Sequence, residues 1–280
     1  MVVVSKITSY TLHPHFQVQH IMGLADVHIH TIYSYDATTT VRGVLKQASS
    51  VGLNVIAVTD HDDIRGAFDA RELASEYNLE VIPGVEVSTK DGHLLALFIE
   101  QIPPRGLSLA ETLKHIGGLG GIAVAPHPFN QLPGSLSMDN VIGTLTKPEL
   151  KEILRGIEIY NMTTQPFDEK VQRLSSYLPF AKTAGSDAHV YWAIGTGTTE
   201  FEGTTATELR TALENATTIP HPFEEDLMRK YIFNWLRRIT MRRLGGYVSD
   251  HAIAEATIQT QRMDLRFTKK QRVKVKRKTK

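Results

Sequence analysis

Two histidines one residue apart end the first apolar segment of this 280-residue chain, in the run Asp26-Val27-His28-Ile29-His30. Alternate side chains of a strand share a face, so the imidazoles of His28 and His30 can bind one metal ion together. A lone His-X-His pair is weak evidence, because surface strands carry such pairs by chance. Its meaning depends on which other residues reach the same place.

Ionisable residues also lie at the ends of other apolar segments. They occur in Thr59-Asp60-His61-Asp62, Gly84-Val85-Glu86-Val87-Ser88, the segment that begins at His93, Ala125-Pro126-His127-Pro128 and Ser186-Asp187-Ala188-His189. Taken singly, each histidine is more often a hydrogen-bonded core residue, and Glu86 is as well explained by a structural ion pair. Together the segments hold six of the 12 histidines. Burying such a set without cations costs on the order of several kcal/mol per group, so we expect a multinuclear metal site if these ends meet.

An alternation of strands and helices would bring these ends together. The strand candidates are Leu24–Ile29, Asn54–Thr59, Leu79–Val87, His93–Ile99, Gly121–Ala125, Gly156–Tyr160, Phe180–Ala184 and Thr196–Phe201. The helix candidates are Thr40–Val51, Ile64–Tyr77, Ser108–Gly117, Glu149–Leu154, Asp168–Leu178 and Thr205–Asn215. This order predicts an α/β fold with a parallel sheet, closed or nearly closed into a barrel. On a β/α barrel, active sites lie at the carboxyl ends of the strands. An open doubly wound sheet is the competing topology.

The composition limits which protein classes remain. Hydrophobic residues make up 41% and charged residues 22% of the chain, as in a globular protein with a sizeable core. Cysteine is absent, so disulfides, thiolate ligands and cysteine nucleophiles are excluded, and any metal ligands must be histidines and carboxylates. No apolar run approaches the ~20 residues that span a bilayer, and the first residues do not resemble a secretory signal. We therefore expect a cytoplasmic protein with no membrane contact.

Charge divides the chain into an acidic body and a basic end. Residues 221–280 hold 16 of the 31 Lys and Arg but six of the 30 acids, and residues 262–280 hold ten Lys and Arg. We expect an N-terminal arm over 1–23, a main domain over 24–220, a helical extension over 221–261 and a basic tail over 262–280. The extension begins with a helix over Glu224–Leu244, with apolar residues on one side and Arg237, Arg238, Arg242 and Arg243 on the other. The tail suits a nucleic-acid partner, with a solvated terminus as the alternative.

The ordered motifs Asp26-Val-His-Ile-His, Thr59-Asp-His-Asp, Gly84-Val-Glu-Val-Ser, Ala125-Pro-His-Pro and Gly185-Ser-Asp-Ala-His resemble those of the PHP (polymerase and histidinol phosphatase) superfamily. The resemblance covers residues 24–215. It implies a distorted (β/α)7 barrel, here with a C-terminal basic helical extension. It also implies two or three bound Zn, Mn or Fe ions and the hydrolysis of phosphate esters.

The resemblance implies three groups of metal ligands. His28, His30, Glu86 and Asp187 would bind one ion; Glu86 would bridge to a second ion, completed by His93 and His127; Asp36, His61 and His189 would bind the third. Asp36 lies in a loop one residue longer than in many relatives, and its alternative role is a helix start signal. Asp26 and Asp60 would orient imidazoles from outside the ligand set.

Other residues are candidates for the reaction itself. Asp62 is the candidate proton donor, because the neighbouring His61 is assigned to metal. Arg42 and Arg65 have the donor geometry to bind a phosphate bidentately, with solvated helix residues as the alternative. The resemblance places Asn161 toward the pocket, whereas Glu158 is expected to be structural.

These expectations define the predicted function. The protein should be a phosphoric ester hydrolase that uses a di- or trinuclear metal site and a metal-bridging hydroxide. The basic end favours a nucleotide or nucleic acid over a small phosphorylated metabolite such as histidinol phosphate. A non-catalytic, metal-stabilised nucleic-acid-binding module is the alternative from another class. The oligomeric state, the native metal and the choice between monoester and diester are left open.

Overall fold

A sheet of nine strands forms the centre of the protein. The computed structural model describes residues 21–130, 134–164, 168–222 and 227–244. The strands are β1 (Met22–Ile29), β2 (Val55–Val58), β3 (Glu80–Ser88), β4 (His93–Leu97), β5 (Ile122–Ala125), β6 (Leu154–Asn161), β7 (Ala181–Gly185), β8 (Thr198–Glu202) and β9 (Ile219–His221). Their order in the sheet is β7-β6-β5-β4-β3-β2-β1-β8-β9. The eight expected strands are therefore present, and β9 is added beside β8.

The sheet is mixed, which corrects the expectation of a parallel one. β3 and β4 pair antiparallel, as do β4 with β5, β1 with β8 and β8 with β9, whereas the other neighbouring pairs are parallel. Residues 89–92 between β3 and β4 are too few for the crossover that parallel strands need. Because β4 runs backwards, its first residue, His93, pairs with Ser88 at the carboxyl end of β3. The reversal brings His93 to the end of the barrel where the other ionisable residues lie.

The segment that follows β7, at one end of the sheet, meets β1 across the barrel. Ile29 and Ala188 form a parallel bridge, and the His30 N–H donates to the Ala188 carbonyl at 3.1 Å. Ser186 N–H donates to Asp26 Oδ1 at 3.1 Å across the same gap. The barrel is thus nearly closed, as expected, and the open doubly wound alternative is wrong. Closure places the end of β7 beside the end of β1.

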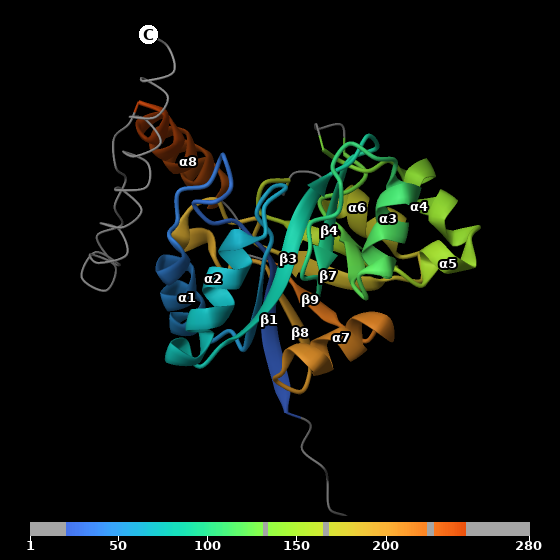
Figure 1. Cartoon of the computed structure of the whole chain (residues 1–280), viewed down its shortest axis with the longest axis horizontal. Helices are drawn as coiled ribbons and strands as arrows, with labels where there is room; N and C mark the ends of the chain where they lie inside the picture. Colours follow the sequence, from blue (N-terminus) through green and yellow to red (C-terminus); the bar gives the residue numbers. More distant parts are fainter. Residues whose placement is uncertain (1–20, 131–133, 165–167, 223–226, 245–280) are drawn as a thin grey trace, which may run out of the picture.

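Helices cover the outside of the barrel. They are α1 (Val41–Ser50), α2 (Arg65–Leu73), the 3-10 helix η1 (Ala74–Tyr77), α3 (Leu109–Gly118), α4 (Met138–Leu145), α5 (Pro148–Lys151), α6 (Asp168–Ser175) and α7 (Ala206–Glu214). Figure 1 shows α1 and α2 on one side, α3 to α6 on the other, and α7 below β8 and β9. Ser108 and Glu111 form the expected capping box of α3. α4 was not expected, although Ser137 caps it through the Asn140 N–H.

Apolar side chains are buried on both faces of the sheet. One layer joins the strands to the outer helices through residues such as Val44, Ile56 and Leu113. The other includes Ile82 and Leu97 and is covered by Leu213 of α7. With apolar packing on both faces, the polar ends of the strands are held at fixed positions relative to one another.

The last described helix, α8 (Leu227–Arg243), lies at the upper end of the molecule, near the loop that follows β1 (Figure 1). Its expected division into an apolar face and an arginine face is wrong. Tyr231 and Ile239 are buried, Phe233 is 69% exposed, and Arg242 points into the body of the protein. Backbone carbonyls of the loop after β1 need hydrogen-bond donors, and Arg242 on the inward face of α8 supplies them.

Parts of the N- and C-terminal predictions lie outside the described residues. These are residues 1–20 of the arm, residues 245–261 of the expected helical extension and the basic tail over 262–280. Within the described chain, β1 begins at Met22, and Pro220 lies in β9. No helix of this described part is both long and apolar enough to cross a bilayer.

Candidate metal centre

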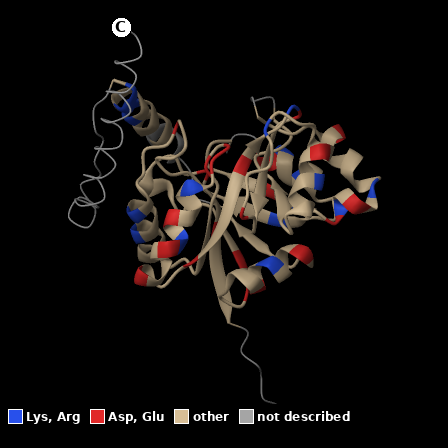
Figure 2. Ribbon diagram, in the orientation of Figure 1, with Lys and Arg blue, Asp and Glu red and all other residues tan. Residues whose placement is uncertain are grey.

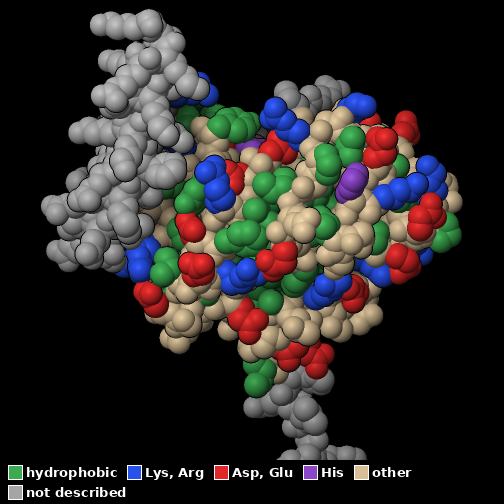
Figure 3. Space-filling view, viewed as in Figure 1, with side chains coloured by type: hydrophobic (Ala, Val, Ile, Leu, Met, Phe, Trp, Pro, Cys, Tyr) green, Lys and Arg blue, Asp and Glu red, His purple; other side chains and the backbone are tan. Residues whose placement is uncertain are grey.

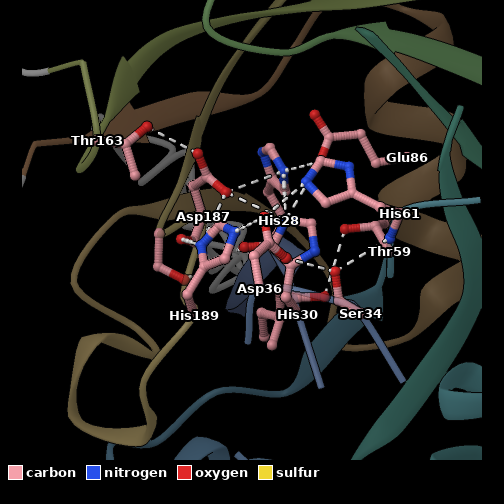
Figure 4. Close-up of polar contacts among 12 residues, drawn as sticks. His28, His30, Ser34, Asp36, Thr59, His61, Glu86, Thr163, Asp187 and His189 are labelled. Carbon is pink, nitrogen blue, oxygen red and sulfur yellow. Dashed lines mark hydrogen bonds and ion pairs between the residues drawn. The ribbon is translucent and has the colours of Figure 1, made fainter. Parts of the chain in front are cut away.

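Nine side chains from distant parts of the sequence meet at the carboxyl end of the barrel. They are His28, His30, Asp36, His61, Glu86, His93, His127, Asp187 and His189. In Figure 4 the side chains of His28, His30, Asp36 and His189 point toward one another, and in Figure 3 a histidine is visible in a hollow of the upper surface. Acidic residues line the loops around this end of the strands (Figure 2). The structure therefore brings together every residue that the sequence proposed as a metal ligand.

The first group has the spacing of a tetrahedral site. His28 Nε2 lies 3.2 Å from His30 Nε2, 3.2 Å from Glu86 Oε2 and 3.3 Å from Asp187 Oδ1. His30 Nε2 lies 3.2 Å from Glu86 Oε2 and 3.1 Å from Asp187 Oδ1. Ligands bound at ~2.0–2.1 Å to one tetrahedral ion are about 3.3–3.4 Å apart. Five edges of the tetrahedron thus have nearly the required length.

The second group forms around the other oxygen of Glu86. Glu86 Oε1 lies 2.8 Å from His93 Nδ1 and 3.2 Å from His127 Nε2. Glu86 is completely buried and lies within β3. Its Oε1 faces His93 and His127, whereas its Oε2 faces His28 and His30. Among the described residues, the set compact enough to hold one ion here is His61, Glu86 and His93, and His127 adds its contact with Glu86. The bridging role expected for Glu86 stays a prediction.

The third group is centred on Asp36. Asp36 Oδ2 lies 3.2 Å from His61 Nε2 and 3.2 Å from His189 Nε2. Ser34 Oγ donates to Asp36 Oδ1 at 2.7 Å and fixes the carboxylate. The groups overlap, since His30 lies near the third group and His61 Nδ1 lies 3.3 Å from Glu86 Oε2.

The buried carboxylates at this site need positive charge beside them. Burial opposes ionisation of Glu86 and Asp187, yet the surrounding imidazoles hold the pKa of both carboxyls well below the usual range. Burial also opposes protonation of His30, but hydrogen bonds to Asp187 and Glu86 raise its pKa to about 10. Two buried carboxylates are thus stabilised by positive charge, from either protons or metal ions.

The orientation of the imidazoles fits metal ions. His189 Nδ1 lies 2.8 Å from the Asp187 carbonyl, which can only accept, so Nδ1 carries the proton and the Nε2 lone pair faces Asp36. His93 Nδ1 lies 2.8 Å from Glu86 Oε1. His61 faces Asp36 through Nε2 and Glu86 through Nδ1, and in the neutral ring only one of these two nitrogens has a free lone pair. Lone pairs directed at a shared space beside carboxylates are the donor set of a divalent cation.

Unusual backbone angles occur where the ligands are. Asp187 has φ 49° and His127 has φ 30°, in the left-handed region that non-glycine residues seldom occupy. The His127 carbonyl accepts from Asn130 Nδ2 at 2.6 Å and from Ser135 Oγ at 2.9 Å, which stabilises this conformation. Strained residues held by their surroundings are typical of functional sites.

Comparison with known families agrees with this geometry. Residues 26–190, more than half of the chain, match the family model of the PHP domain, and residues 168–218 match a PHP-associated model. The chain belongs to the PHP family. The resemblance seen in the sequence is thereby confirmed, and with it the class of phosphoric ester hydrolase.

Several relatives are similar to parts of the chain. An uncharacterized protein of Methanocaldococcus jannaschii is 35% identical over 147 residues, 49% of this chain and 81% of that protein. The phosphoribosyl 1,2-cyclic phosphate 1,2-diphosphodiesterase of Eggerthella lenta is 36% identical over 87 residues, 29% of this chain and 33% of the enzyme. The 5'-3' exoribonuclease of Haemophilus influenzae is 33% identical over 93 residues, 32% of this chain and 34% of the enzyme.

Solved structures share the fold. PsfC from Pseudomonas syringae has a TM-score of 0.59 at 17% identity, covering 79% of this chain and 99% of that one. A Bifidobacterium adolescentis protein assigned as a metal-dependent phosphoesterase has a TM-score of 0.52 at 20% identity, covering 68% and 95%. The lesion-specific endonuclease PfuEndoQ from Pyrococcus furiosus has a TM-score of 0.51 at 17% identity, covering 69% and 56%.

Asp26 and Asp60 act on the backbone of the PHP site rather than on its imidazoles, which corrects the expectation. Asp26 accepts from the N–H groups of His28, Ser186 and Gly195 at 2.9–3.3 Å. Asp60 accepts from Thr31 N, Thr31 Oγ1 and Ser34 N, and so fixes the turn before Asp36. Both carboxylates position the loops that carry ligands.

Glu158, which was expected to be structural, lies beside the candidate ligands of the PHP site. Its Oε1 lies 3.3 Å from His28 Nδ1, and it is 1% exposed. Gly185 of β7 makes room for it, since a Cβ at Gly185 would lie 2.0 Å from Glu158 Oε1. An acid buried in an apolar strand was the signal that identified Glu86, and it applied equally to Glu158.

The remaining predicted residues lie around the cluster. Asn161 is 1% exposed and donates to Glu158 Oε2 at 2.8 Å, while its Oδ1 accepts from Thr163. Asp62 Oδ1 accepts from Ser88 N at 2.9 Å and so connects the ends of β2 and β3.

The two arginines are paired outside the nine-residue cluster. Arg42 contacts Glu76 at 2.8 Å and the Tyr77 hydroxyl at 3.4 Å, both in η1. Arg65 contacts Asp63 at 2.5 Å and lies over the ring of Tyr33, with 62% of its side chain exposed. Of the two, Arg65 is adjacent to the β2 end of the PHP site, whereas Arg42 is committed to a helix contact.

Proposed function

We propose that the nine residues bind two or three divalent metal ions, Zn, Mn or Fe, and that the protein uses them to hydrolyse phosphate esters. The observation that carries this proposal is the tetrahedral spacing of His28, His30, Glu86 and Asp187. Divalent ions, when bound, supply charge to neutralise phosphoryl oxygens and lower the pKa of a water molecule toward neutrality. The protein supplies the fixed donor set and the surrounding loops.

The exposure of the ligands indicates where a phosphate enters. His28 and His30 are fully buried, whereas the side chain of His93 is 24% exposed. Tyr35 is 67% exposed, and its ring stacks on His61 with a centroid distance of 5.1 Å. The ester would approach between Tyr35 and His93, with Arg65, which lies over the ring of Tyr33, as the proposed phosphate contact. A buried Asn161 would act by orienting Glu158.

A nucleotide or nucleic acid is the substrate class that we favour. The names of two relatives denote a diphosphodiesterase of a cyclic phosphate and an exoribonuclease, and one structural neighbour is an endonuclease. The basic residues of 262–280 would add counterion release on a polyanion. A stacked, exposed Tyr35 is also suited to a base next to the scissile phosphate.

A panel of phosphate esters tests the proposal. The purified protein, loaded with Mn²⁺ or Zn²⁺, should hydrolyse nucleotide diesters or short oligonucleotides, lose activity in chelator and regain it with metal. Glu86→Gln should abolish turnover, whereas Glu152→Gln, an exposed pair with Arg155, should not. Preference for histidinol phosphate would favour the metabolite phosphatase. Metal-loaded protein that turns over nothing on the panel would contradict catalysis.

Asp62 is the proposed proton donor to the leaving oxygen. Asp62→Asn keeps the hydrogen-bond acceptor for Ser88 N, so the ends of β2 and β3 should keep their positions. We expect a loss of turnover of ~10²-fold or more with unchanged metal content. Equal turnover of variant and wild type would remove Asp62 from the mechanism.

The basic tail is tested separately by deleting residues 262–280. The truncated protein should bind a single-stranded oligonucleotide more weakly, and the slope of log K against log salt should become flatter, by ~0.7 for each lost phosphate contact. Hydrolysis of a small diester should be unchanged. An unaltered slope would show that the tail does not contact the substrate.

A further inference from the structure

α8 lies beyond the residues that match the PHP models, which end at residue 218, yet it reaches two loops of the site. One loop follows β1 and carries Asp36, and the other follows β7 and carries Asp187 and His189. Three side chains on the inward face of α8 make these contacts: Tyr231, Trp235 and Arg242.

Tyr231 fixes the loop after β7. Its hydroxyl is buried, donates to the Asp187 carbonyl at 3.0 Å, accepts from His189 N at 3.3 Å and lies 2.9 Å from His189 Nδ1. The contact holds the ring of His189 with its Nε2 toward Asp36.

Trp235 and Arg242 fix the loop after β1. Trp235 Nε1 donates to the Asp36 carbonyl at 2.8 Å. Arg242 donates to the carbonyls of Ser34 and Ile32, both at 2.8 Å, and also to that of Ala37. Four carbonyls of this short loop are thus bound by one helix.

We propose that α8 helps to form the metal centre. Tyr231, Trp235 and Arg242 of α8 are positioning residues for the third group of ligands, the group centred on Asp36. The inference rests on the proposed metal site. Asp36 and His189, the ligands that α8 touches through their backbone or ring, face each other at 3.2 Å. The two loops also contact each other directly, since the Thr38 N–H donates to the His189 carbonyl at 3.0 Å, and α8 adds its contacts to both loops. Partners outside the ligand set typically change metal affinity by ~10–100-fold.

Selective loss of one metal is the expected effect. Tyr231→Phe removes the hydroxyl and keeps the ring, and Arg242→Gln removes the fork that binds three carbonyls. In the full chain, each variant should bind one ion ~10–100-fold more weakly in competition with a chelator, with the remaining ions within about twofold of wild type. Tyr177→Phe, at an 84% exposed tyrosine, and the exposed Arg237→Gln are the matched controls.

The affinity measured for each ion distinguishes a positioning role of these residues from a general packing role. It also distinguishes a failure of this inference from a failure of the proposed function. A loss of packing alone would lower thermal stability in chelator without selecting one ion. Equal affinity for every ion in Tyr231→Phe, Arg242→Gln and wild type, or an equal loss at all ions, would overturn the role of α8. If wild type binds no divalent ion at all, the proposed metal site fails first, and that result is visible before any variant is made.

Discussion

Glu158 lies beneath His28, with its Oε1 3.3 Å from His28 Nδ1, while its Oε2 accepts from His127 N at 2.9 Å. One buried carboxylate therefore orients a ligand of the first group and a ligand of the second. Because the Nδ1 of His28 faces Glu158, its Nε2 is left facing Glu86 and Asp187. A carboxylate behind an imidazole ligand fixes the ring and raises its basicity.

Glu158→Gln should weaken metal binding without removing a ligand. The amide keeps the size of the side chain but removes the charge behind His28, so we expect metal affinity to fall by ~10-fold or more. Chelator competition on the purified variant measures this change. Glu152→Gln, exposed in the same region of sequence, should match wild type. Wild-type affinity in Glu158→Gln would mean that Glu158 serves packing alone.

Gly185→Ala should disrupt the contact between Glu158 and His28, because Gly185 packs against both side chains. The new Cβ would lie 2.0 Å from Glu158 Oε1 and 2.8 Å from His28 Cβ, so one of them must move. We expect the free energy of unfolding to fall by ~1–3 kcal/mol, measured by chemical denaturation, together with weaker metal binding. Gly143→Ala in α4 is the control, because its Cβ meets open space and alanine favours a helix by up to ~1 kcal/mol. A neutral Gly185→Ala would contradict the close packing.

Much of the fold could be predicted from the sequence, because strands such as β2, β3 and β5 are apolar segments that end in or are followed by polar residues. The wrong predictions concern features that depend on contacts between distant parts of the sequence. The chain between Ser88 and His93 can only turn back, yet local alternation does not show the direction of a strand. Arg242 was placed on the side of the helix opposite the apolar residues, whereas the carbonyls that it binds lie more than 200 residues away in the sequence.

Metal binding should release protons. Hydrogen bonds to Asp187 and Glu86 raise the pKa of His30 to about 10, so without metal this imidazole is charged at pH 8, whereas a ligand must be neutral. Affinity should therefore rise with pH up to about pH 10. Titration calorimetry in buffers of different ionisation enthalpy measures the release at pH 8. A heat of binding that does not depend on the buffer would contradict the protonated cluster.

Asp168 should make stability depend on pH. Burial raises its pKa to about 7, with the Glu158 charge contributing and the Asn161 N–H opposing. In the unfolded chain the pKa of an aspartate is ~3.9. Between pH ~3.9 and pH 7, Asp168 therefore holds a proton in the folded chain but not in the unfolded chain, so the free energy of unfolding falls as the pH rises toward 7. Asp168→Asn should then be more stable than wild type by ~1–3 kcal/mol at pH 8, with a smaller gap at pH 5. The exposed Asp139→Asn is the control, and a gap that does not change with pH would contradict the shift.

The candidate ligands could be found from the sequence because metal ligands are ionisable residues at strand ends, which are conspicuous in an apolar pattern. The residues that orient them were harder to find. Tyr231 and Trp235 are ordinary aromatic residues of an amphipathic helix, and only the packing of α8 shows that their polar atoms reach Asp187 and Asp36. A metal ligand can be recognised in a sequence by the chemistry of its side chain, whereas a positioning residue is recognised from the contacts that it makes in the structure.

Anomalous diffraction from crystals of the wild-type protein, recorded at the absorption edges of Zn, Mn and Fe, tests the central claim most directly. We predict at least two peaks within coordination distance of the cluster, one of them shared by His28, His30, Glu86 and Asp187. Crystals grown with these metals that show no peak among these four residues would contradict it.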